Sequence, residues 1–164
     1  MAAPCYITWN AAAPTSAAIS GVATGTSIKT MLQLKPGSSK LRIIEWGYSF
    51  ETVPTAMVRV ELIDTSTVAA TVTAAVAAGV MPYNDVTGAA SLATLSTTGT
   101  GYTASAEGTV TSGRLLAYQE EWGSQFKQQF PLGREPELNT GNLLRIRVTT
   151  ATTINMSCYL VWEE

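Results

Sequence analysis

The chain has 164 residues, enough for one domain with an apolar core that needs no disulfide or metal to stabilise it. Hydrophobic residues make up 46% of it and charged residues only 13%, about half the usual share, so Thr, Ser, Ala and Gly must cover much of the surface. The net charge of −2, without a cluster of Lys and Arg, argues against a nucleic-acid-binding protein.

Residues 1–26 are predicted to form an extended N-terminal arm. Cys5 to Trp9 has strand character, and a stretch rich in Ala, Pro and Gly follows it. The first residues lack the basic and apolar regions of a secretory leader, and no segment reaches the ~20 apolar residues of a membrane-spanning helix. We therefore expect a protein that is made in the cytoplasm and has no membrane partner.

Strand patterns occupy the next part of the chain, over 27–35, 40–51 and 56–65. Each is rich in β-forming residues, and the first and third alternate apolar with polar side chains, the period of a half-buried strand. Pro36-Gly37 after the first segment is a strong turn signal. Gly47, in the middle of the second segment, predicts a bulge or a close approach of another group to the backbone.

Residues 66–80 carry conflicting signals. Valines recur every four residues from Val68 to Val80, as on a helix, whereas the threonines between them disfavour a helix and the alanines disfavour a strand. We predict a strand, or a strand with one helical turn. Residues 85–109 are rich in Gly, Thr, Ser and Ala and are predicted to form a long loop around Tyr102. Loops of this length are usually functional or mobile.

The strand pattern resumes in the last third, over 110–119, 124–130, 144–149 and 154–162. About eight strands with turn signals between them predict an all-β fold, an antiparallel, jelly-roll-like β-sandwich over 27–164. The arginines of this part are expected on the solvent side of their strands: Arg114, Arg134, Arg145 and Arg147. The core positions of the two closing strands are expected to be Ile146, Val148, Ile154, Met156, Leu160 and Trp162.

Two cysteines lie at opposite ends of the chain, in strand-like segments where a free Cys behaves as a small hydrophobe. A disulfide requires the terminal strands to be neighbours, and a cytoplasmic protein keeps its thiols reduced, so we favour two free thiols. Cys5 to Trp9 and Cys158 to Trp162 share the pattern Cys-Tyr-x-x-Trp. The repeat either marks paired terminal strands or arises by chance.

Catalytic and metal-binding patterns are scarce. The chain has no His, which removes the commonest general base and most zinc and copper sites. Close carboxylates occur at Glu120-Glu121 and at Glu135-Pro-Glu137, where a glycosidase pair is a weaker interpretation than solvated strand ends and turns. The sequence therefore predicts a protein that is not an enzyme and has no cofactor and no metal.

Aromatic residues offer the main candidates for partner contact. Trp46 and Trp162 lie in apolar strands and are expected in the core. Trp122 lies in a polar connection and is the leading candidate for an exposed contact with a partner subunit or a ligand. Phe126, on the following strand, and Tyr102, in the long loop, are the other two candidates.

Several segments, read together, resemble one family. They are Leu41–Phe50, Val60–Val72, Gly101–Val110, Phe130–Leu138 and the closing Cys158–Glu164. They resemble the small minor capsid or head-decoration proteins of tailed bacteriophages that infect actinobacteria. The resemblance runs from about residue 26 to the end and carries no catalytic signature. It implies a β-sandwich on the outer face of an assembled capsid, as a homotrimer bound to the major capsid protein.

Two classes of function stay open at this point. The first is a structural virion protein that decorates or cements a phage capsid. The second is a ligand- or carbohydrate-binding β-sandwich module of a phage fibre or receptor-binding protein, which would present an exposed aromatic residue beside polar loop residues.

Overall fold

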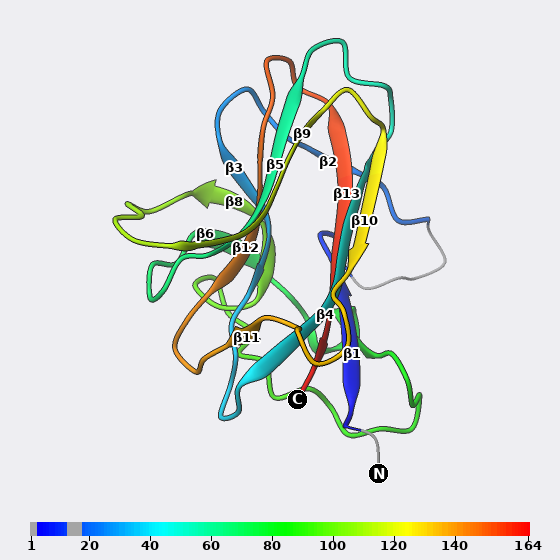
Figure 1. Cartoon of the computed structure of the whole chain (residues 1–164), viewed down its shortest axis with the longest axis vertical. Helices are drawn as coiled ribbons and strands as arrows, with labels where there is room; N and C mark the ends of the chain where they lie inside the picture. The colour runs from blue at the N-terminus through cyan, green and yellow to red at the C-terminus, as the bar shows by residue number, and fades with distance from the viewer. Residues whose placement is uncertain (1–2, 13–17) are drawn as a thin grey trace.

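The computed structural model describes residues 3–12 and 18–164, which form two antiparallel sheets packed face to face (Figure 1). The predicted all-β sandwich is confirmed, with thirteen strands in the described residues where about eight were predicted. The extra strands are mostly two to four residues long. Such pieces are too short to show an alternating pattern in the sequence.

The seven-stranded sheet has the order β10-β4-β13-β1-β7, with β11 also paired to β4 and β2 to β13. Its strands are β1 (Cys5–Trp9), β2 (Val22–Ala23), β4 (Leu41–Phe50), β7 (Val80–Pro82), β10 (Gln125–Gln129), β11 (Glu137–Leu138) and β13 (Asn155–Glu163). The six-stranded sheet has the order β6-β8-β3-β12-β5-β9. Its strands are β3 (Lys29–Leu34), β5 (Val58–Asp64), β6 (Thr71–Ala74), β8 (Gly101–Ala106), β9 (Arg114–Glu121) and β12 (Leu144–Thr149).

The core lies between the two sheets and is formed by alternate residues of their facing strands. Trp46 and Trp162 are completely buried in it, as predicted. Of the core positions predicted for the closing strands, all are buried except Ile154, which is partly buried and packs against the same cluster. Period-two alternation therefore identifies the inner face of β12 and β13 correctly.

The first and last strands are neighbours, as the shared Cys-Tyr-x-x-Trp pattern suggested. β1 pairs antiparallel with β13, placing Cys5 opposite Glu163 and Trp9 opposite Tyr159. Both cysteines are free, as favoured from the sequence, because antiparallel pairing puts Cys5 and Cys158 at opposite ends of this pair. Within the predicted arm over 1–26, residues 5–9 form β1, which lies inside the seven-stranded sheet between β13 and β7.

The middle of the chain confirms one prediction and corrects another. Residues 66–80 contain the short strand β6 and one turn of 3-10 helix, η1 (Ala77–Gly79), which confirms a strand with one helical turn. Residues 85–109 are not one continuous loop, because 101–106 form β8 between β3 and β6. The glycine and the two alanines of β8 are weak strand formers, and pairing on both edges overrides that preference.

A segment that includes 65–70 covers part of the outer face of the six-stranded sheet. The prediction that Arg145 faces solvent is therefore wrong. Arg145 is completely buried, and its guanidinium donates hydrogen bonds to the backbone oxygens of Val68 and Glu107. Its Nη1 atom also lies 3.5 Å from the Glu107 carboxylate. Gln33, its neighbour on β3, is buried too and bonds both backbone groups of Ala70 with its side chain.

The connections β2–β3, β4–β5, β9–β10 and β12–β13 cross from one sheet to the other at the same end of the sandwich, at the top of Figure 1. We call this end, formed by residues 24–28, 51–57, 122–124 and 150–154, the crossover end. At this end the amide of Phe50, the last residue of β4, donates to the oxygen of Ser124 in the β9–β10 connection at 2.7 Å. This end is where the candidate residue Trp122 lies.

Candidate functional site

The three predicted contact residues occupy different environments. Trp122 lies in the connection between β9 and β10 with 56% of its surface exposed. Phe126 on β10 is partly buried and packs against Trp46 and Tyr48, with ring centroids 5.2 Å and 5.5 Å apart. Tyr102 on β8 belongs to the other sheet and is also partly buried against the core. Trp122 alone among them presents most of its surface to solvent.

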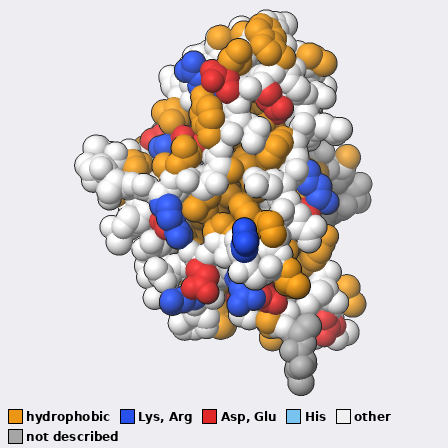
Figure 2. All heavy atoms as spheres, in the orientation of Figure 1, with side chains coloured by type: hydrophobic (Ala, Val, Ile, Leu, Met, Phe, Trp, Pro, Cys, Tyr) orange, Lys and Arg blue, Asp and Glu red, His pale blue; other side chains and the backbone are white. Residues whose placement is uncertain are grey.

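Trp122 has exposed apolar neighbours at the crossover end. Val53 and Met57, on the β4–β5 connection, are 69% and 44% exposed. Figure 2 shows hydrophobic side chains gathered at this end of the molecule, in the view in which the crossover end is uppermost. Leu115 and Tyr118 add further exposed apolar surface on β9, which is an edge strand of its sheet. Exposed apolar residues of this size concentrate where proteins meet partners.

The base of this end is held by a bond between the two sheets. The Tyr48 hydroxyl on β4 donates a short hydrogen bond to the carboxylate of Glu121, the last residue of β9. Burial, reinforced by this carboxylate, raises the pKa of Tyr48 well above its usual range. The neighbouring Glu120 pairs instead with Arg59 on the adjacent strand β5, at 2.9 Å. The two adjacent carboxylates therefore make different contacts, because successive side chains of a strand point to opposite faces of the sheet.

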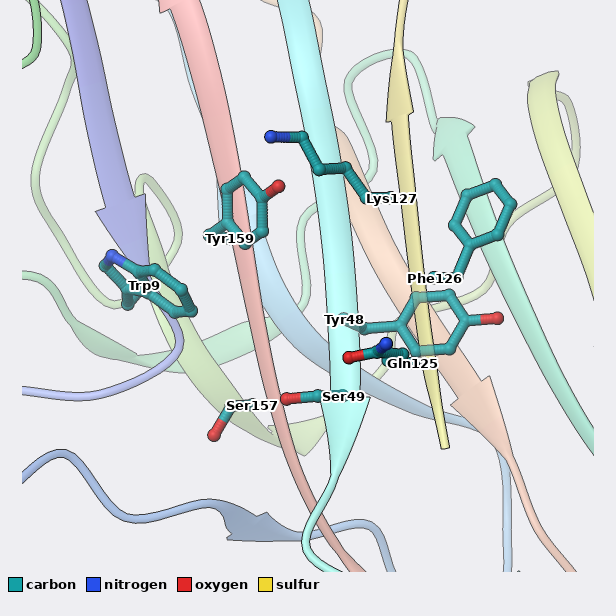
Figure 3. Close-up of a pocket in the computed structure, with 8 residues that line it drawn as sticks. All are labelled: Trp9, Tyr48, Ser49, Gln125, Phe126, Lys127, Ser157 and Tyr159. Atoms are coloured by element: carbon teal, nitrogen blue, oxygen red, sulfur yellow. The ribbon is translucent and has the colours of Figure 1, made fainter. Parts of the chain in front are cut away.

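A second surface feature, which sequence reasoning missed, is a hollow of about 430 Å³ on the seven-stranded sheet (Figure 3). We call it the aromatic trough. The side chains that carry its chemistry come from β1, β4, β10 and β13: Trp9, Ser49, Gln125, Lys127, Ser157 and Tyr159. Strand registers set them in two rows, with Trp9, Tyr159, Gly47 and Lys127 in the first row and Ser157, Ser49 and Gln125 in the second.

Gly47 explains how the aromatic end of the trough is built. The rings of Trp9 and Tyr159 lie 4.8 Å apart at 38°. A Cβ atom at Gly47 would come within 2.7 Å of Cε1 of Tyr159, so a larger residue there would displace the ring. The close approach predicted from a glycine in mid-strand is therefore confirmed. Phe126, one of the predicted contact residues, also lines the hollow. Neither it nor the glycine revealed which ring approaches the backbone.

The charged groups beside the trough are paired with each other. The Tyr159 hydroxyl donates to Oε1 of Glu45 at 2.6 Å, and Nζ of Lys127 lies 3.1 Å from the same oxygen. Glu45 is nearly buried, whereas the Lys127 side chain is mostly exposed. Burial and then the bond to Glu45 raise the pKa of Tyr159 well above its usual range. The phenol therefore stays protonated and fixed in place at neutral pH.

Across 3–12 and 18–164, no group of three or more His, Cys, Asp or Glu side chains is placed to hold a metal ion. The same residues contain no helix that is both long enough and apolar enough to span a membrane. The chain matches no known protein family, no curated protein and no solved structure. Its function must therefore be argued from its own residues and surfaces.

Proposed function

We propose that the protein is a structural virion protein that decorates or cements the outer surface of a phage capsid. Its partners are the major capsid protein and further copies of itself, assembled as a homotrimer on the virion after synthesis in the host cytoplasm. The trimer and the capsid partner rest on the resemblance of Leu41–Phe50, Val60–Val72 and the later segments to phage head-decoration proteins. The proposal needs no catalytic group, cofactor or nucleic acid.

The observation that carries the proposal is the exposed apolar surface of the crossover end. Val53, Met57 and Trp122 lie on connections between sheets, and each leaves at least 44% of its surface exposed. Apolar surface gains roughly 25 cal/mol per Å² when it is buried, and Trp is the residue most often found at the energetic centre of an interface. A protein shell that covers this end would supply that burial.

Rigidity of the crossover end supports the same use. The hydrogen bond from Phe50 to Ser124 ties the β9–β10 connection to β4, and the Tyr48–Glu121 bond ties β4 to the end of β9 beside it. Contact residues held in place before binding lose less conformational entropy on association. Trp122 therefore occupies a position suited to anchoring a partner.

The test combines mass measurement with capsid binding. Light scattering of the purified chain at micromolar concentration should give about three times the 17.3 kDa of one chain, and the protein should co-sediment with capsids that lack it. Trp122→Ala should weaken the co-sedimentation at least tenfold, because interface tryptophans contribute about 2 kcal/mol or more.

Leu132→Ala is the matched control for Trp122→Ala. Leu132 is 95% exposed and lies beyond the other end of β10, away from the crossover end. Its loss should leave capsid binding unchanged. A monomer that does not co-sediment with capsids would overturn the proposed function. Equal effects of the two substitutions on capsid binding would overturn the role of the crossover end.

A further inference from the structure

The aromatic trough combines a tilted pair of neighbouring rings with unused hydrogen-bonding groups. Trp9 and Tyr159 are both partly exposed and stand side by side at one edge of the hollow, as Figure 3 shows. Such rings offer an apolar face beside a polar tip. The tilt of 38° between them makes a twisted platform instead of a flat one. A twisted platform fits a flexible chain-like ligand better than a rigid planar ligand.

The second row of the trough supplies donors and acceptors. Ser157, Ser49 and Gln125 lie in register on adjacent strands, and their side chains point to the same face. Among the described residues these three side chains form no hydrogen bond. Two strand spacings separate the first from the last, about 10 Å. Hydroxyl and amide groups can both donate and accept, so this row suits a ligand with many hydroxyl groups.

The charge of the trough limits the ligand further. Lys127 is the cation beside it, and its ammonium is already paired with Glu45 at 3.1 Å. The Tyr159 hydroxyl donates to the same carboxylate. A charged ligand would have to compete with this internal pair and leave one partner uncompensated, which is costly for the buried Glu45. The trough therefore favours a neutral ligand.

We propose that the aromatic trough is a binding site for a neutral glycan chain of pyranose sugars. One sugar ring stacks its apolar face on Trp9 and Tyr159, and the hydroxyls of the chain bond to Ser157, Ser49 and Gln125. A hollow of about 430 Å³ lies within the usual range for ligand sites, about 300–1,000 Å³. The inference does not rest on the capsid function, since the residues of the trough and of the crossover end are different.

The experiment is a calorimetric titration of the full chain with neutral hexasaccharides: cellohexaose, chitohexaose, maltohexaose and xylohexaose. At least one should bind saturably, and Trp9→Ala should weaken that binding tenfold or more. Trp122→Ala, which removes an exposed tryptophan outside the trough, should bind as the native chain does. If none of the four sugars binds at millimolar concentration, the proposal is wrong.

A milder pair of variants guards against misfolding of Trp9→Ala. Gln125→Ala removes an exposed amide from the trough, and Gln129→Ala removes an amide that is also exposed on the same face of β10, outside the hollow. Gln125→Ala should weaken binding by about threefold to tenfold, as expected for one net hydrogen bond. Gln129→Ala should leave it unchanged. Equal affinities of these two variants would also overturn the proposed site.

Discussion

Replacing Arg145 by Met should destabilise the fold much more than replacing a solvent-exposed strand arginine would. The arginine is completely buried and donates to two backbone oxygens, those of Val68 and Glu107, the second at 2.8 Å. Hydrogen bonds from a charged donor contribute about 1.5–3 kcal/mol each, so the two together amount to roughly 3–6 kcal/mol. Loss of one partner of a buried ion pair costs about 3–5 kcal/mol, which agrees with that range.

Met keeps most of the aliphatic volume of Arg145, so the loss reports the polar contacts and not an empty cavity. We expect the free energy of unfolding to fall by about 3–5 kcal/mol, measured by urea titration with circular dichroism. Arg59→Met is the matched control, because Arg59 pairs with Glu120 on the surface with most of its side chain exposed. The control should leave the urea midpoint unchanged. A loss below about 1 kcal/mol for Arg145→Met would refute the burial of this side chain under 65–70.

Other predictions test the core, the trough and the ionisable groups. Leu160→Ala removes a completely buried side chain of β13 and should cost about 2–5 kcal/mol by urea titration, whereas a cost under about 0.5 kcal/mol would contradict its place in the core. Gly47→Ala should cost about 1–3 kcal/mol and lower sugar affinity, because the new methyl group collides with the Tyr159 ring and with the backbone oxygen of Phe126. Unchanged stability would contradict this close approach. Burial raises the pKa of Tyr48 and Tyr159 in the folded chain, so their contribution to stability is complete below about pH 10 and is lost as the pH rises further. Tyr48→Phe should therefore flatten the fall in melting temperature above pH 10, and an equally steep fall would contradict this assignment. EDTA should leave the melting temperature unchanged, and a shift of several degrees would reveal a structural metal.

The parts of the fold that the sequence predicts are those in which one strand face is apolar and the other polar. β12 meets this condition over its six residues and β13 over most of its nine, and their inner faces were assigned almost completely. β2 and β11 have two residues each, and no periodicity exists over so short a length. These strands are defined by their partners β13 and β4, which only the folded chain brings to them.

The error at Arg145 has a different physical origin. Alternation shows that Leu144, Arg145 and Ile146 point to opposite faces in turn, but it does not show what covers the second face. Here the segment over 65–70, with Glu107 beside it, covers that face and supplies the oxygens that a buried guanidinium needs. A polar residue in a strand predicts a solvent-exposed position only when no other part of the chain can hydrogen-bond to its side chain.

The aromatic trough was beyond sequence reasoning because its residues meet only through register. Trp9 and Tyr159 come from the two ends of the chain, and they face each other because β1 pairs with β13. Gly47 and Lys127 complete the row because β4 and β10 continue the same sheet. A shift of one residue in any of these pairings would turn the affected side chain toward the core and remove it from the row. The site is therefore a property of the assembled sheet, and its chemistry depends on the same strand pairing that holds the two termini in the fold.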